Sequence, residues 1–308
     1  MKSRFNLTHV AIVSFFFVLL IVSSCAKETS QSGTDSQEEE LSKAVGESDA
    51  EAQSTYNGLF DDVMGVNNEV GVAGSGVFYG RLDTMMPVAR CFTVTITHPT
   101  ANSFPVIVVI DFGITGCPGP DGRIRKGKII TEYTKRLIYP GAIATTNFDK
   151  FYVDDIHVEG THKITNISVI PVPPANLIEK YNVEVIDGKL TKPDGNYIEW
   201  KSNRTITQVE GFATPADIRD DAYEITGGAS GLVKRSNLLV RWESTITEPL
   251  LRRMTCQWIV RGRIRTVRAN LPDPTNSHWV AVLDFGTGNC DNLATITING
   301  VTRQITLP

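Results

Sequence analysis

The sequence predicts an all-β protein, an antiparallel and sandwich-like meander. Three observations predict it. A local pattern occurs twice: Asp111-Phe112-Gly113 and Asp284-Phe285-Gly286 each have a cysteine, Cys117 or Cys290, six residues after the aspartate. Asp-Gly, Asn-Gly and similar turn signals recur about every ten residues, as hairpins require. The stretches between them are short and rich in β-branched residues, and no long helical period follows residue 70.

The repeated pattern predicts two related hairpin units, each clamped by a disulfide. An upstream cysteine, Cys91 or Cys256, opens a strand-like run before each copy. If Thr93–Thr97 folds back on Val106–Ile110 with His98 opposite Val106, each upstream cysteine lies near its downstream partner. We therefore expect Cys91–Cys117 and Cys256–Cys290, at the Cα separation that a disulfide needs. The alternative is four unpaired buried thiols.

Residues 1–24 predict a signal peptide. Lys2 and Arg4 precede the apolar run Val10–Val22, which is too short to span a membrane. The following Val22-Ser23-Ser24-Cys25 resembles the lipobox of bacterial lipoproteins. The resemblance implies cleavage before Cys25 and lipid, including palmitate, on that cysteine; Ala26 after it implies the outer membrane. The alternative is an ordinary cleaved signal beside an unrelated cysteine.

The cysteine count agrees with export. Of the five cysteines, Cys25 is set aside for lipid, and an even number in an oxidising compartment indicates a disulfide framework.

Composition divides the mature chain into a tether and a body. Residues 26–50 contain seven acidic residues and two lysines, a charge of −5, with few apolar residues. We expect the lipidated Cys25 and this stretch, residues 25–50, to form a disordered, solvated tether. Lys2 and Arg4 contribute +2 to the chain total of −4, so residues 51–308 carry −1 and have no broad attraction to nucleic acid.

The body, residues 51–308, is long enough for one β domain or for two lobes, about 51–175 and 176–308. A short helix is expected from Tyr56 to about Glu69. The remaining strands are expected at Ile143–Tyr152, Ile164–Ile170, Tyr181–Ile186, Tyr197–Trp200, Arg204–Phe212, Leu238–Trp242, Ala294–Ile298 and Val301–Leu307. Turns are expected at Pro120-Asp121-Gly122, Asp187-Gly188, Pro193-Asp194-Gly195, Gly227-Gly228 and Asn299-Gly300.

These features together resemble outer-membrane-type lipoproteins of Bacteroidetes. The resemblance also includes Gly127-Lys128-Ile129-Ile130, Tyr133-Thr134 and Cys256-Gln257-Trp258-Ile259-Val260. It implies display on the outer membrane, facing the periplasm or the surface, and it brings no known activity, catalytic residue or cofactor. Asp83-Thr84-Met85 resembles the short O-glycosylation motif of such proteins.

Two groups of side chains are candidates for ligand binding. Arg261, Arg263 and Arg265 alternate along one strand, so they project from one face that is suited to an anionic polysaccharide or lipid headgroup. The alternative is a solvated sheet face. Trp200 and Trp242 are candidate platforms for stacking on sugars, whereas Trp258 and Trp279 are expected in the core.

Two constellations have simpler structural interpretations. Asp111 and Asp284 suit the turns that follow them better than an acid–base pair. His157 and His162 with Asp154 and Asp155 fit a hairpin better than a metal site. We therefore expect no catalytic residues, metal or cofactor. The expected function is a lipid-anchored, non-enzymatic binding or structural module, with protein partners undetermined. The alternatives are a carrier of an apolar ligand in a curved sheet and a glycan-acting enzyme.

Overall fold

The computed structural model describes residues 35–307, except 72–90, 102, 120, 138, 171–176, 214–219 and 270–278; helix side chains are described for residues 36–64. The signal peptide, Cys25, the first part of the expected tether and Asp83-Thr84-Met85 lie outside the described residues. No helix in the described part is both long and apolar enough to cross a membrane.

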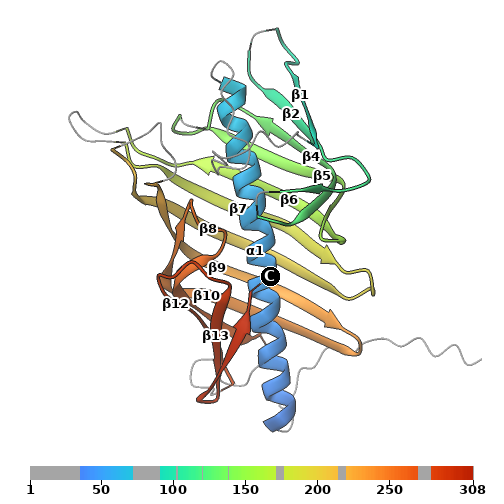
Figure 1. Cartoon of the computed structure of the whole chain (residues 1–308), viewed down its shortest axis with the longest axis vertical. Helices are drawn as coiled ribbons and strands as arrows, with labels where there is room; N and C mark the ends of the chain where they lie inside the picture. Colours follow the sequence, from blue (N-terminus) through green and yellow to red (C-terminus); the bar gives the residue numbers. More distant parts are fainter. Residues whose placement is uncertain are drawn as a thin grey trace, which may run out of the picture.

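One antiparallel sheet contains all 14 strands, and consecutive strands are neighbours apart from β3, which pairs beside β2 on β4 (Figure 1). The all-β meander is therefore confirmed. The strands are β1 (Thr93–Thr97), β2 (Val106–Asp111), β3 (Cys117–Pro118), β4 (Ile124–Tyr133), β5 (Ile143–Val153), β6 (Ile156–Asn166), β7 (Lys180–Thr191), β8 (Tyr197–Glu210), β9 (Ala222–Arg235), β10 (Leu238–Arg253), β11 (Ile259–Arg268), β12 (Ala281–Thr287), β13 (Leu293–Ile298) and β14 (Val301–Thr306).

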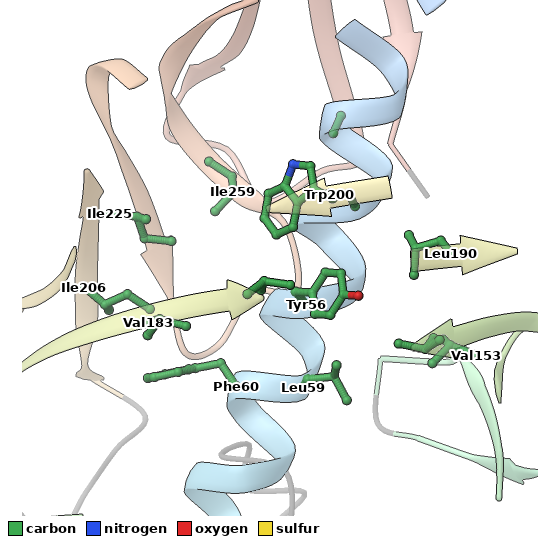
Figure 2. Packing of buried hydrophobic residues seen from close by; sticks show 14 of the residues in the cluster. Tyr56, Leu59, Phe60, Val153, Val183, Leu190, Trp200, Ile206, Ile225 and Ile259 are labelled. Carbon is green, nitrogen blue, oxygen red and sulfur yellow. The ribbon is translucent and has the colours of Figure 1, made fainter. Parts of the chain in front are cut away.

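Among the described residues, a single long helix, α1 (Asp35–Gly71), crosses the strands on the concave side of the sheet (Figure 1). Its N-terminal part lies near β13, and its C-terminal part reaches β4. Apolar side chains recur along it at helical spacing and enter the core: Leu41, Val45, Ala52, Tyr56, Leu59, Phe60 and Val63. Figure 2 shows Tyr56 beside Trp200, with Leu59 and Phe60 one turn further along the helix.

The helix corrects two expectations. The disordered tether is wrong from Asp35 onward, because residues 35–50 are helical and several of their polar side chains are buried. The predicted helix from Tyr56 to Glu69 is therefore only the second half of α1. Composition suggested solvation because this stretch has few apolar residues. Four of its carboxylates instead bond to distant arginines or indoles of the sheet: Glu38, Glu39, Glu47 and Asp49.

The layering is also simpler than a sandwich. The second layer, packed against the sheet, is α1 rather than another sheet. The proposed boundary near residue 175 falls between β6 and β7, which pair directly from His157↔Thr191 to Asn166↔Tyr181. The sheet is therefore continuous across that boundary.

Both cysteine-clamped hairpin units are confirmed. Cys91 and Cys117 are bonded with Cα atoms 5.5 Å apart, and Cys256 and Cys290 with Cα atoms 5.7 Å apart. Thr97 pairs with Ile107, so His98 falls opposite Val106 as expected. In both copies of the repeat, the phenylalanine after the aspartate is buried; Asp111 ends β2, whereas β12 continues past Asp284 to Thr287.

Some strand limits differ from expectation. β6 ends at Asn166, and the two short strands expected over residues 197–212 are one strand, β8. Asp187-Gly188 and Gly227-Gly228 lie inside β7 and β9. Two glycines there have packing roles. A Cβ on Gly188 would lie 2.7 Å from the Tyr56 hydroxyl, and one on Gly231 would lie 2.4 Å from the Trp242 ring.

Candidate functional site: the inner face of the sheet

The inner face of the sheet is the face that carries Trp200, Arg204 and Trp242 and packs against α1; the outer face is its opposite. Four arginines on the inner face are almost completely buried, with exposed fractions of 5% or less: Arg125, Arg204, Arg252 and Arg268. We call these the inner-face arginines. A buried cation needs a well-placed anion, because desolvation of an unpaired charge is strongly unfavourable.

Three inner-face arginines find that anion on α1. The Arg125 Nε donates to Asp62 at 2.9 Å, and an Arg268 Nη donates to Glu38 at 2.8 Å. Arg252 is paired with Asp61. Burial raises the pKa of Asp62 to about 6, while the charge of Arg125 acts in the opposite direction. The acidic residues of α1 therefore lie against a cationic sheet surface.

Less buried pairs extend this contact along the helix. Glu47 accepts from Arg235 at 3.0 Å, and Glu51 accepts from Lys192 at 2.9 Å. Glu39 is paired with Arg303 on β14. The whole helix carries ten acidic residues and one lysine. The charge complementarity thus runs from β4 to β14 across the inner face.

Asp49 is the polar centre of the interface. Its Oδ1 accepts hydrogen bonds from the Trp200 indole at 2.9 Å, the Trp242 indole at 3.2 Å and the Ser244 hydroxyl at 2.9 Å. Asp49 itself is 1% exposed. One carboxylate therefore holds three elements together: α1, β8 and β10.

This geometry corrects the interpretation of the two tryptophans as exposed platforms. Trp200 and Trp242 are 3% and 1% exposed, because their indole N–H groups point at Asp49 under the helix. Trp200 also stacks on Tyr56, with ring centroids 5.4 Å apart. Trp258 and Trp279, expected in the core, are half-buried and pack against it.

Arg204 is the exception among the inner-face arginines. Its three side-chain nitrogens have no hydrogen-bond partner among the described residues. It lies over the Trp200 ring at 5.8 Å. Burial lowers the pKa of Arg204, and the charge of Asp49 partly offsets that effect. Arg204 is thus a buried cation that is not bonded to α1.

The histidines do not converge with the nearby aspartates. His157 is half-buried and stacks on Tyr152. His162 is fully buried, and burial lowers its pKa to about 4. Asp154 accepts from Arg123 and from the Ile124 amide. In the described ranges, no three His, Cys, Asp or Glu side chains are grouped to hold a metal ion.

Arg261, Arg263 and Arg265 share one face of β11, as expected, and that face is the outer one. Arg261 and Arg263 are exposed and Arg265 is half-buried. Arg263 contacts Glu248 at 2.6 Å and Asp284 at 2.7 Å, and Arg261 lies 3.5 Å from Glu224. The neighbouring carboxylates favour the interpretation as a solvated, ion-paired sheet face, and an anionic ligand must compete with them.

The two repeat aspartates have the structural role that their turns suggest. The Gly113 amide donates to Asp111 Oδ1, and the Gly286 amide donates to Asp284 Oδ1, both at 2.9 Å. The hydrogen bond from Gly113 is the main reason that the pKa of Asp111 is lowered. Both glycines have positive φ, 69° and 90°. Asp111 thus shapes the turn after β2, and Asp284 accepts its bond where the pairing of β12 with β11 shifts register.

Two further cavities lie outside the polar centre. One of about 70 Å³ lies between α1 and the segment near Trp258, and Asp61 and Asp121 both line it. Arg125 binds Asp121 through two Nη atoms, and the pKa of Asp121 is lowered although burial raises it. A general acid needs a raised pKa, so Asp121 is not suited to that role.

The second cavity is an open depression of about 580 Å³. Trp200 and Trp242 border it, together with charged residues that belong to the outer face by strand register: Lys189, Glu199, Lys201, Arg241 and Glu243. The indole N–H groups of both tryptophans are bonded to Asp49.

The sequence alone did not point to Asp49, Arg204 or Arg125. The signal that could have found them is the pairing of an acidic, periodically apolar stretch with arginines inside otherwise apolar strands. No protein-family model, curated protein or solved structure matches the chain.

Proposed function

We propose that the protein is a lipid-anchored, non-enzymatic module of the outer membrane. We further propose that its binding surface is the inner face of the sheet and that α1 is an intramolecular occupant of that surface. The partner it suits is an acidic, amphipathic helix. The observation that carries the proposal is the pairing of three inner-face arginines with carboxylates of α1.

The placement of the proposed anchor supports a functional role for α1. Cys25 precedes the first residue of the helix, Asp35, by ten positions. A lipid on Cys25 is then joined by a short segment to the helix that crosses the whole sheet. Anything that moves α1 relative to the sheet changes how the body is held at the membrane.

An exchange experiment tests the binding surface. A protease site is inserted between Gly71 and Cys91 of the otherwise complete mature chain, and the chain is cut after folding. Fluorescent peptide 35–71 is then added in excess, and anisotropy reports its uptake. We expect the peptide to bind more weakly as the salt concentration rises. Salt screens the partly exposed ion pairs of α1, such as Glu47–Arg235 and Glu51–Lys192.

Matched peptides make the test specific. A peptide with Asp61→Asn and Asp62→Asn should compete poorly, because it removes the carboxylate paired with Arg252 and one of the two carboxylates paired with Arg125. A peptide with Glu40→Gln should compete normally, since Glu40 is exposed. If the cut protein keeps its own α1 and takes up no peptide, α1 is a permanent core element and the inner face is not a recognition surface.

A carrier of an apolar ligand is the second candidate. The inner face around α1 is lined with aliphatic side chains such as Val183, Ile206 and Ile225. The two cavities beside the helix, about 70 and 20 Å³, are smaller than a lipid chain, so a ligand must displace α1. A fluorescent fatty acid added to the cut protein, and displaced by peptide 35–71, supports this candidate; no fatty-acid binding contradicts it.

The proposed anchor has its own test. Cells labelled with radioactive palmitate should yield a labelled protein, and the Cys25→Ala chain should carry no label and leave the membrane fraction. Label that persists in Cys25→Ala contradicts the anchor, whatever the exchange experiment shows.

A further inference from the structure

A small cavity of about 20 Å³ lies between α1 and strands β6 to β9. Gln53 of α1, His162 of β6 and Arg204 of β8 line it together, and none of them is more than 5% exposed. Ser202 adds a hydroxyl, and aliphatic side chains form the rest of the wall. The cavity is therefore a polar space closed in by apolar surroundings.

The polar groups around this cavity are not satisfied by the protein. The three side-chain nitrogens of Arg204, both ring nitrogens of His162 and both amide atoms of Gln53 lack hydrogen-bond partners in the part of the chain that the structure describes. Buried polar groups in native proteins are nearly always bonded to protein, water or an ion. Such a concentration of unpaired polar atoms around one cavity indicates that the cavity holds a bound water, ion or small ligand.

The charged and polar groups that face the cavity determine which charge a bound species should carry. Arg204 brings a positive charge and five donor hydrogens. His162 is neutral at physiological pH, because burial lowers its pKa to about 4. Tyr56 directs its hydroxyl to the Glu159 carbonyl at 2.9 Å. Asp49 is the carboxylate that acts electrostatically on Arg204; its Oδ1 is bonded to three donors, and its Oδ2 has no hydrogen-bond partner among the described residues.

We propose that this cavity binds one small monovalent inorganic anion, of chloride or bromide size, between the Arg204 guanidinium and the Gln53 amide. The volume suits one or two water-sized groups and excludes sulfate or phosphate. The site stands independently of the proposed function. Gln53 belongs to α1 and Arg204 to β8, so a bound anion would link the helix to the sheet. At this point Arg204 forms no direct ion pair with the described part of α1.

The test uses the complete mature chain and bromide as the probe. Crystals grown or soaked in sodium bromide should show an anomalous peak beside Arg204. In solution, melting temperature is compared in bromide, chloride and gluconate at equal ionic strength. With the halide at about ten times its dissociation constant, we expect a melting temperature about 3 °C higher than in gluconate.

Variants assign the effect to the cavity. Arg204→Met should abolish the halide shift, and Arg263→Met on the outer face should retain it. If Arg204→Met does not fold, the anomalous map of the unaltered chain decides alone. The proposal is overturned if that map shows no bromide at Arg204, only an ordered water, and if melting is the same in halide and gluconate.

Discussion

Glu38 of α1 and Arg268 of β11 are 230 positions apart and form an ion pair of 2.8 Å, with side-chain exposures of 2% and 1%. The contact ties the acidic beginning of the helix to a strand near the end of the chain. It shows that a stretch with the composition of a tether is part of the folded core.

A double-mutant cycle on Glu38 and Arg268 tests the coupling. Each single change, Glu38→Gln or Arg268→Met, should lower the free energy of unfolding by about 3–5 kcal/mol, because it removes one charge of a buried ion pair. The double variant should lose much less than the sum. Denaturant unfolding measures all three, and Lys43→Met, at an exposed helix position, serves as control. Additive losses contradict the coupling.

Asp49→Ala tests the polar centre. The change removes one acceptor from two buried indole N–H groups and the Ser244 hydroxyl, and each orphaned donor costs about 1–3 kcal/mol. We expect a loss of at least 3 kcal/mol in the free energy of unfolding and a shift in tryptophan fluorescence, because Trp200 and Trp242 lose their shared partner. Gln304→Ala, exposed on β14, should change neither quantity. A small loss for Asp49→Ala contradicts the central role of this carboxylate.

His162 predicts a pH dependence of stability. Its folded pKa of about 4 lies below its ordinary value of 6.5, so the unfolded chain binds the proton more readily. The contribution of neutral His162 to the free energy of unfolding is therefore complete above pH 6.5. As the pH falls toward 4, about 3 kcal/mol of that free energy is lost.

The matched variant for this titration is His162→Leu. Unfolding free energies of both chains are measured from pH 7.5 to 4, and only their difference is interpreted, since carboxylates also titrate over this range. The free energy of unfolding of the unaltered chain minus that of His162→Leu should fall by that amount between pH 7.5 and pH 4. A constant difference would falsify the assignment to His162.

Gln53→Glu tests whether Arg204 lacks only an anion. The new carboxylate faces the same cavity as Arg204. A charge-assisted hydrogen bond should raise the free energy of unfolding at pH 7 by about 1–3 kcal/mol. The halide dependence of melting should disappear, because the site then has its own anion. Gln304→Glu, exposed on β14, is the control. A destabilised Gln53→Glu shows that the two side chains do not face each other.

Removal of either disulfide should lower the free energy of unfolding, because the unfolded chain then gains conformational entropy. The Cys91–Cys117 bond closes a loop of sequence separation 26, and the Cys256–Cys290 bond one of 34. The loss of loop-closure entropy in the unfolded chain predicts a stabilisation of roughly 3–4 kcal/mol for each bond. Cys91→Ser with Cys117→Ser, and Cys256→Ser with Cys290→Ser, should each lower the denaturation midpoint. Non-reducing peptide mapping of the unaltered chain should yield only these two crosslinked species. A Cys91–Cys290 link contradicts the two hairpin units.

The sequence by itself determined the features that depend on neighbours along the chain. The repeated Asp-Phe-Gly turns, the register that places His98 opposite Val106 and the pairing of Cys91 with Cys117 follow from strand alternation and turn geometry. Arg261, Arg263 and Arg265 share one face for the same reason, since side chains alternate along a strand.

Only the tertiary structure decided what lies against the inner face. Residues 35–50 looked solvated because their apolar content is low, and Trp200 and Trp242 looked available because their strands alternate. Both interpretations failed at the same interface, where Asp49 accepts from the two indoles and Glu38 meets Arg268. Burial of polar side chains depends on partners up to 230 positions away, and local composition and periodicity contain no information about such partners.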